Sequence, residues 1–207
     1  MDQEIFNYIQ NYIVRDNCKS DTIKEEEYQR DDVQPSIELE TGKFLGLLIR
    51  LINAQKVLEF GTCLGYSTIW LGEAVKQTGG KVISIEKDPK LYQEAKTNIE
   101  EAGLSNSVEL VYGDISEKIR DLTGPYDIIF QGAQKSLYPK VLENSINLLN
   151  QGGVLVADDT LFKVKGAPRN LGAPVDEYNR KVMSDDRLYS TILPVGDGVT
   201  LSYKIRQ

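Results

Sequence analysis

Short apolar runs alternate with amphipathic segments from residue 57 onward. Runs rich in Val, Ile and Leu are typical of buried strands, and the segments between them have the spacing of helices. Strand and helix in alternation predict a mostly parallel sheet that helices cover on both faces. The five runs occupy residues 57–60, 81–86, 108–112, 126–130 and 153–157.

The end of the chain departs from this alternation. A helical segment at about 175–184 precedes two apolar runs, 188–194 and 199–205, which are separated by Gly196-Asp197-Gly198. Asp-Gly between two apolar runs indicates an antiparallel hairpin. The predicted fold class is therefore α/β, a doubly wound, mostly parallel seven-stranded sheet with a C-terminal antiparallel hairpin and N-terminal helices.

Three helical segments are expected before the first strand. Apolar side chains recur at helical spacing in residues 2–16, which predicts a packed helix, whereas the charged residues 20–32 predict a solvated one. A third apolar stripe runs through residues 37–53. We divide the chain into an N-terminal helical extension, residues 1–35, and one domain, residues 36–207.

Composition removes several classes of chemistry. The 207 residues include no histidine, which excludes Ser-His and Cys-His nucleophile pairs, an imidazole base and the usual His-containing zinc sites. Proton transfer must use Lys, Asp, Glu, Tyr or Cys. With 24 basic and 31 acidic residues the formal charge is −7, which disfavours general binding to nucleic acid but leaves a local site for one particular RNA open.

Cysteine usage and the N-terminus bear on the compartment. Cys18 and Cys63 are 45 residues apart without a Cys-x-x-Cys spacing, so neither a disulfide framework nor a thiolate metal cluster is expected. The acidic N-terminus does not resemble a signal peptide, and the most apolar stretch, 44–52, is short and contains Arg50. We expect a protein of the reducing cytoplasm that does not enter a membrane.

A glycine-rich turn follows the first predicted strand and precedes a helix. In this context the backbone can approach a nucleotide-like ligand. The spacing is Gly61-x-x-x-Gly65, which fails the Gly-x-Gly-x-x-Gly dinucleotide fingerprint. The alternative is that the two glycines make a tight strand-to-helix turn and nothing more.

Acidic residues end the next two apolar runs. Glu86 lies 25 residues after Gly61, where a carboxylate can accept hydrogen bonds from both hydroxyls of a ribose. Its alternative interpretation is an exposed carboxylate at a strand end. Asp114 follows the third run, so polar groups at three successive strand ends converge on the crevice where open α/β sheets bind ligands.

Several segments together resemble the S-adenosylmethionine-dependent O-methyltransferases related to catechol and caffeoyl-CoA O-methyltransferases, from about residue 36 to the end. The resemblance implies a Rossmann-like class I methyltransferase fold, S-adenosylmethionine as cofactor, a small hydroxylated acceptor or a hydroxylated base of transfer RNA, and a homodimer. The segments are Glu-Phe-Gly-Thr-Cys-Leu-Gly-Tyr-Ser, Ile-Glu-Lys-Asp-Pro, Tyr-Gly-Asp-Ile, Gly-Gly-Val-Leu-Val-Ala-Asp-Asp and Leu-Pro-Val-Gly-Asp-Gly-Val-Thr-Leu.

The resemblance also implies roles for single residues. One group binds the cofactor, a lysine is catalytic, and a late acidic pair ligates a metal. For the cofactor, Glu59, Gly61 and Ser67 would hold the methionine part, Thr62, Gly65 and Tyr66 would shape the turn, Glu86 would hold the ribose, and Asp114 and Ile115 would border the adenine. The catalytic lysine corresponds to Lys135, and the metal ligands correspond to Asp158 and Asp159.

The chain departs from the family at one metal ligand. Where the family reads Asp-Ala-Asp-Lys, this chain has Gly132-Ala-Gln-Lys135. Asp158 and Asp159 then either hold Mg²⁺ or another divalent cation weakly, with an extra water, or cap the next segment. Without strong help from a cation, Lys135 would act as a neutral base with a pKa lowered by burial or by the sulfonium; the alternative is a surface lysine.

Three functions stay open on the sequence alone. The first is an active O-methyltransferase, with or without a cation, acting on a catechol-like compound or a transfer RNA base. The second is an S-adenosylmethionine-binding module that has lost catalysis, and the third is a nucleotide-dependent oxidoreductase, which the glycine spacing and the hairpin oppose. In the expected loop 162–174, Lys163, Lys165 and Arg169 either meet an anionic acceptor or form a solvated loop.

Overall fold

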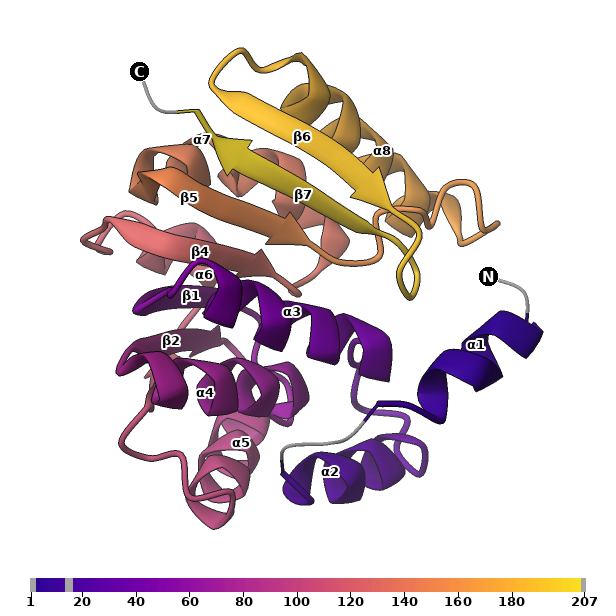
Figure 1. Cartoon of the computed structure of the whole chain (residues 1–207), viewed down its shortest axis with the longest axis vertical. Coiled ribbons are helices and arrows are strands. Elements are labelled where there is room, and N and C mark those ends of the chain that lie inside the picture. The colour runs from indigo at the N-terminus through magenta and orange to yellow at the C-terminus, as the bar shows by residue number, and fades with distance from the viewer. Residues whose placement is uncertain (1–2, 14–16, 206–207) are drawn as a thin grey trace.

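The alternating pattern folds into one seven-stranded sheet with the strand order β3-β2-β1-β4-β5-β7-β6 (Figure 1). The structure is a computed structural model that describes residues 3–13 and 17–205. The first five strands are parallel, β7 is antiparallel to β5, and β6 is antiparallel to β7, which confirms the predicted fold class. The strands are β1 Lys56–Phe60, β2 Lys81–Glu86, β3 Val108–Tyr112, β4 Tyr126–Gln131, β5 Leu149–Ala157, β6 Leu188–Leu193 and β7 Val199–Lys204.

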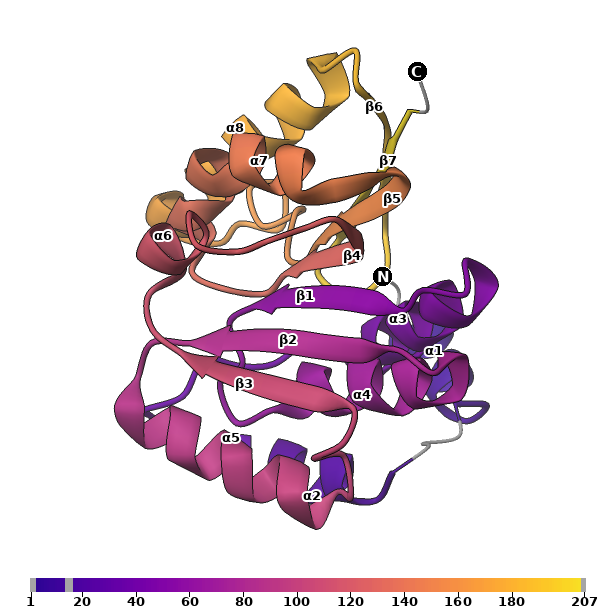
Figure 2. The same ribbon diagram turned by 90° about the vertical axis from the view of Figure 1, so that its left-hand side faces the viewer.

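Helices cover both faces of the sheet (Figure 2). Successive strand residues point to opposite faces, so Val57 packs into the core on one side and Leu58 into the core on the other. On the first side lie α2 (Lys19–Glu27), α3 (Leu39–Leu51), α4 (Tyr66–Thr78) and α5 (Pro89–Glu101). On the second lie α6 (Ile115–Lys118), α7 (Tyr138–Leu148) and α8 (Arg169–Ser184).

The carboxyl ends of the central strands meet at one edge of the sheet. Phe60 at the end of β1 pairs with Ile85 on one side and Gln131 on the other, and Gln131 pairs with Ala157. The strand order reverses between β1 and β4, which makes this edge the topological switch point where open α/β sheets bind ligands.

The N-terminal helices differ from the expectation in length and in burial. Helix α1 spans Gln3–Gln10 rather than 2–16, and residues 14–16 of the expected helix lie outside the described residues. Two of the side chains in the expected apolar stripe, Ile5 and Tyr12, are mostly exposed, so the prediction of a packed helix is wrong for them. Periodicity identifies an apolar face, but it does not say whether a neighbouring element covers that face.

Helix α2 shows the opposite error. It was expected to be solvated, yet Ile23 is fully buried in the core beside α4, and the Glu27 carboxylate is buried and accepts a hydrogen bond from the backbone N–H of Ser36 at 3.2 Å. The helix ends at Glu27 instead of continuing to residue 32. Because one apolar side chain is enough to anchor a short charged helix, counting charges overstated its exposure.

Helix α8 begins at Arg169, six residues before the predicted start, and contains Pro174. Its first turn closes when the N–H groups of Leu171 and Gly172 both donate to the carbonyl of Pro168. The predicted loop therefore ends at residue 168, because an internal proline removes one backbone donor without stopping this helix. Of the helices in the described ranges, none has both the length and the apolar composition needed to cross a bilayer.

Candidate functional site

A cavity of about 640 Å³ opens at the carboxyl edge of β1, β2, β4 and β5. Residues 32, 34–36 and 38 of the N-terminal segment and Asp197 of the hairpin turn also line it. The cavity brings together six of the residues predicted for the site, which come from five separate segments of the chain. These are Gly61, Glu86, Ile115, Lys135, Asp158 and Asp159.

Gly61 lets the turn after β1 pass close to the loop after β4. Its φ is +91°, in the left-handed region that favours glycine. A Cβ at this position would lie 2.8 Å from Cα of Ala133, closer than real side chains approach. Gly65, the residue before α4, also has a left-handed φ, +92°. The tight turn is therefore real, and it also forms part of the cavity wall.

Glu59 lies behind that wall and does not line the cavity. The side chain is fully buried, and its two carboxylate oxygens accept hydrogen bonds from Ser67 Oγ at 2.5 Å, Thr68 Oγ1 at 2.5 Å and Ser84 Oγ at 2.6 Å. Burial raises the pKa of Glu59 to about 7, although the three hydroxyl donors oppose the shift. This carboxyl group therefore titrates near neutral pH.

Other residues predicted for the cofactor also pack behind the wall. Thr62 Oγ1 lies 2.6 Å from Ser84 Oγ in the network around Glu59. The Tyr66 ring is buried, with the Lys24 ammonium 5.1 Å from its centroid. Ser67 is buried as well. These side chains shape the turn and orient α4, and their direct contact with a cofactor stays a prediction.

Glu86 is held in place at the cavity surface. Its side chain is 7% exposed, which rules out the alternative of an exposed strand-end carboxylate. Oε2 accepts the N–H of Cys63 at 2.8 Å, and Oε1 accepts the N–H of Asp88 at 2.9 Å. Each carboxylate oxygen can accept a second hydrogen bond, so a fixed Glu86 suits a ligand with two adjacent hydroxyl groups.

Asp114 has a structural role at the start of α6. Its carboxylate accepts the N–H of Ser116 at 2.8 Å and the Ser116 hydroxyl at 2.6 Å. These bonds hold the pKa of Asp114 below its usual value. Its neighbours Gly113 and Ile115 line the cavity, whereas Asp114 itself does not, so contact of its carboxylate with an adenine stays a prediction.

Lys135 lies inside the cavity wall, at the start of the 3₁₀ helix η1 (Lys135–Leu137). The residue is 8% exposed, which rules out a surface lysine. Its ammonium Nζ lies 2.8 Å from Asp159 Oδ2 and 2.9 Å from the Tyr138 hydroxyl. That hydroxyl donates to the Gln131 carbonyl at 2.6 Å. Tyr138 was not among the residues predicted for the site, although a tyrosine three residues after a lysine lies on the same helical face.

The contacts of Lys135 decide the direction in which its pKa shifts. Burial by itself lowers the pKa of the ammonium, whereas Tyr138, Asp159 and Asp158 raise it, and the net direction is upward. The Tyr138 phenol is neutral at pH 7 because burial raises its pKa as well, so Asp159, whose carboxylate contacts Nζ, is the main cause of the upward shift in the pKa of Lys135. This direction is opposite to the one predicted from burial, and the 2.8 Å contact with the Asp159 carboxylate is that of an ammonium.

The two aspartates after β5 do not complete a divalent-cation site. Asp158 is 4% exposed, and its Oδ1 has no hydrogen-bond partner within the described residues. Burial and the neighbouring Asp159 raise the pKa of this carboxyl group, against the effect of Lys135. Asp159 adopts a left-handed φ of +60° and holds Lys135.

The third metal ligand that the resemblance implies is absent, because position 132 is a glycine. A Cβ there would lie 3.0 Å from a ring carbon of Phe130, so an added side chain would need a small shift of that ring. Across the described ranges, no group of three Asp, Glu, Cys or His side chains is placed to hold a metal ion. The residues present therefore do not fit the cation site that the resemblance implies.

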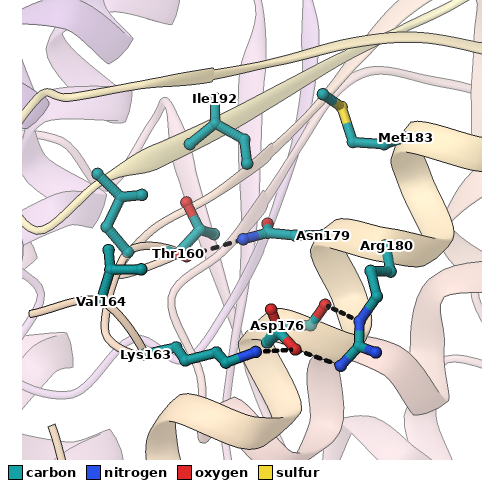
Figure 3. Close-up of a pocket in the computed structure, with 9 residues that line it drawn as sticks. Thr160, Lys163, Val164, Asp176, Asn179, Arg180, Met183 and Ile192 are labelled. Atoms are coloured by element: carbon teal, nitrogen blue, oxygen red, sulfur yellow. Dashed lines mark hydrogen bonds and ion pairs between the residues drawn. The ribbon is translucent and has the colours of Figure 1, made fainter. Parts of the chain in front are cut away.

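A second cavity of about 310 Å³ lies between α8, β6 and residues 160–164 (Figure 3). Among its lining residues Asp176 pairs with both Lys163 and Arg180. Outside this cavity, Lys165 pairs with Asp197 of the hairpin turn. Two of the three predicted basic side chains, Lys163 and Lys165, are thus already neutralised. This supports the interpretation of the segment as a solvated one rather than an anion-binding patch.

Comparison with known proteins gives matches over most of the chain. A family model described as O-methyltransferase matches residues 12–205. A catechol O-methyltransferase of Niastella koreensis is 34% identical over 150 residues, 70% of this chain and 67% of that protein. Caffeoyl-CoA O-methyltransferase 2 of Petunia hybrida is 32% identical over 183 residues, 79% of this chain and 74% of that protein.

Solved structures of O-methyltransferases also match nearly the whole chain. The O-methyltransferase TomG of Streptomyces achromogenes, in complex with S-adenosylmethionine, matches with a TM-score of 0.85 and 25% identity over 100% of both chains. An O-methyltransferase of Bacillus cereus, in complex with S-adenosylhomocysteine, matches with a TM-score of 0.82 and 25% identity over 97% of both chains.

Proposed function

We propose that this chain, which belongs to the O-methyltransferase family, transfers a methyl group from S-adenosylmethionine to a hydroxyl oxygen of a small aromatic acceptor of the catechol or caffeoyl type. One observation carries the proposal. Gly61 and Glu86 on one side, and Lys135 with Asp158 and Asp159 on the other, open into a single cavity at the switch point of the sheet. A cofactor and an acceptor can therefore lie side by side.

The cofactor occupies the half of the cavity formed by β1 and β2. The fixed carboxylate of Glu86 accepts the ribose hydroxyls, and the glycine turn lets the methionine part approach the backbone. Ile115 borders the adenine. Glu59 acts from behind the wall, where its hydrogen bonds hold Ser67 and the first turn of α4 in position.

Methyl transfer then takes place beside Lys135. The sulfur–carbon bond of the sulfonium breaks and leaves its electron pair on sulfur, while a lone pair of the acceptor oxygen forms the new carbon–oxygen bond. The hydroxyl proton passes to solvent as the acceptor binds in its anionic form. A phenol has a pKa of about 10, so on the order of one molecule in a thousand is ionised at pH 7. A fixed ammonium beside the oxygen favours that anion.

Transfer of a labelled methyl group tests this function. Purified protein is incubated with labelled S-adenosylmethionine and a panel of catechols and caffeoyl esters, and the methylated product is measured. We expect Lys135→Ala to reduce turnover at least tenfold, as expected for loss of electrostatic stabilisation. Lys140→Ala is the matched control, because Lys140 is an exposed lysine nearby on α7. Equal turnover in Lys135→Ala would remove Lys135 from the mechanism.

A second candidate is an S-adenosylmethionine-binding module that has lost catalysis. Gly132, where the family has a carboxylate, is the observation that favours it. This candidate predicts cofactor binding by calorimetry without turnover on any acceptor of the panel, so a single productive acceptor excludes it. Membership of the O-methyltransferase family argues against the third alternative, a nucleotide-dependent oxidoreductase.

Several finer points stay predictions. A hydroxylated base of transfer RNA as acceptor, a homodimer, a location in the cytoplasm and the division at residue 35 rest on the sequence or the resemblance. The pairing of Lys163 and Lys165 with aspartates gives no support to RNA binding through that segment.

A further inference from the structure

We propose that the ammonium of Lys135 takes the place of a divalent cation at this site, so that the enzyme methylates its acceptor without a bound metal. The inference rests on the proposed function and deepens it. It concerns the half of the cavity formed by β4 and β5, which we call the acceptor half, and it names the cation there and the kind of hydroxyl group that this half selects. The residues present do not fit the cation site that the resemblance implies.

The site offers few oxygen ligands for a divalent cation. A divalent cation of the Mg²⁺ type needs several oxygen ligands. Position 132 supplies no side chain, and Asp159 Oδ2 already lies 2.8 Å from Lys135 Nζ. Two adjacent carboxylates, one of them paired with an ammonium, leave little negative charge to hold a dication. A dication placed between the aspartates would also be repelled by the ammonium.

The ammonium of Lys135 is held in a fixed position by Tyr138 and Asp159. The Tyr138 hydroxyl, at the start of α7, accepts a hydrogen bond from Nζ and donates one to the Gln131 carbonyl. Donating to a carbonyl turns the phenol oxygen towards the lysine as an acceptor. The Tyr138 ring is buried edge-on against Tyr178, at 5.6 Å between ring centroids. Tyr138 is therefore a positioning residue that fixes the ammonium against Asp159.

One N–H donor of the Lys135 ammonium is left for a ligand. A lysine ammonium carries three N–H donors, and within the described residues Lys135 contacts two hydrogen-bond partners, Asp159 and Tyr138. The residue lines the cavity, so the third donor is available to an oxygen bound there. An ammonium held by two partners and open on one side can hold an anionic acceptor oxygen as a metal ion would.

This arrangement has a consequence for the acceptor. A single positive charge favours an oxygen anion less than a dication does. We therefore expect the enzyme to select aromatic acceptors with acidic hydroxyl groups, such as phenols that carry electron-withdrawing substituents, over plain catechol. Turnover at fixed pH should rise as the pKa of the acceptor hydroxyl falls towards that pH.

Direct titration with Mn²⁺ and Mg²⁺ tests the absence of the metal without any need for activity. The full chain, with and without S-adenosylmethionine, is titrated by calorimetry and by Mn²⁺ paramagnetic resonance. We expect no saturable site below about 1 mM, the range of the weakest protein sites. Tighter binding to the wild type that is lost in Asp158→Asn would overturn the proposal.

Gly132→Asp is the complementary variant, because it adds the missing carboxylate. We expect it to bind Mn²⁺ saturably under conditions where the wild type does not. If the folded variant, checked by its circular dichroism, shows no gain, position 132 is not what the site lacks and the proposal is wrong.

Turnover provides the second readout. With an accepted substrate, the wild-type rate should stay within about twofold when a chelator replaces added Mg²⁺, since metal assistance is normally worth far more than that. A large fall that Mg²⁺ reverses would overturn the inference. If no acceptor is methylated under either condition, the proposed function fails, whereas the titration still decides whether a metal binds.

Charge and shape at position 135 are separated by two variants. Lys135→Met keeps the length of the side chain without its charge, and Lys135→Arg keeps the charge. We expect about a hundredfold loss of kcat in Lys135→Met, a much smaller loss in Lys135→Arg, and an unchanged KM for S-adenosylmethionine in both. Tyr138→Phe should lower kcat with the same unchanged KM. Full activity of Lys135→Met would overturn the proposal.

Discussion

The two halves of the cavity follow the family to different degrees. In the half formed by β1 and β2, Gly61 has the left-handed backbone and Glu86 the fixed, buried carboxylate that a nucleoside ligand needs. In the half formed by β4 and β5, position 132 has no side chain and Lys135 is bound to Asp159. One half has the groups that the resemblance implies, whereas the other lacks one of the implied ligands and contains an internal ion pair.

The difference shows which features depend on backbone and which on charge. The cofactor half is built from a tight turn and from carboxylates that accept backbone N–H groups, so a changed side chain there would disturb the fold itself. The acceptor half is a small set of charges on loops after two strands. Such a set can lose one carboxylate and stay close to neutral, because the neighbouring ammonium pairs with Asp159, one of the two carboxylates that remain.

Gly61→Ala is expected to have the largest effect, and it tests whether the cofactor half depends on backbone geometry. The added Cβ would approach Cα of Ala133 to 2.8 Å at a φ of +91°. We expect S-adenosylmethionine affinity, measured by calorimetry, to fall at least about a hundredfold, and the unfolding free energy to fall by about 3 kcal/mol from strain and overlap.

Gly79→Ala is the matched control for that variant. Gly79 also has a positive φ, +74°, but a Cβ there meets no atom within 4 Å. This variant should lose about 1 kcal/mol from backbone strain alone and keep its cofactor affinity. If both variants behave alike, close approach of the two loops is not what Gly61 provides.

A second prediction concerns the buried carboxyl group behind the cofactor half. The pKa of Glu59 is about 7 in the folded chain and 4.5 in its ordinary state. A raised folded pKa means that the folded state holds the proton more tightly. The associated stability is present below pH 4.5 and is lost as the pH rises to 7, by at most about 3 kcal/mol.

Glu59→Gln isolates this dependence. The amide cannot ionise, so the unfolding free energy from urea titrations should fall less between pH 5 and pH 8 in the variant than in the wild type. An identical pH dependence would show that Glu59 does not titrate in this range. Turnover is not needed for the measurement, so the result bears on the cofactor half alone.

The third prediction separates the two halves within one experiment. Glu86→Gln should weaken S-adenosylmethionine binding about tenfold, because an amide replaces one of the acceptor oxygens of a charged group. Lys135→Met should leave that affinity within about twofold and act on turnover instead. If Lys135→Met weakens cofactor binding as much as Glu86→Gln does, the division of the cavity into two halves is wrong.

The sequence predicted the fold and the convergence of the site well, because both follow from strand order. Short apolar runs placed the strands, and the switch point then brought Gly61, Glu86 and Asp158 to one edge. What could not be predicted depends on contacts between distant segments. Periodicity did not reveal that α2 is anchored by Ile23, and spacing did not reveal that Asp159 turns towards Lys135.

The smallest effect is expected at the second cavity, where Lys163 and Asp176 form an exposed ion pair. Exposed pairs contribute between zero and about 1 kcal/mol, and neither residue lines the main cavity. Lys163→Ala should therefore leave turnover, and the KM for an anionic caffeoyl ester, within about twofold of the wild type. Asp176→Ala is the paired control, since it frees Lys163 and Arg180 together. A raised KM for the anionic ester in Lys163→Ala alone, with an unchanged KM for a neutral catechol, would show that Lys163 contacts the acceptor and that the acceptor half includes this segment.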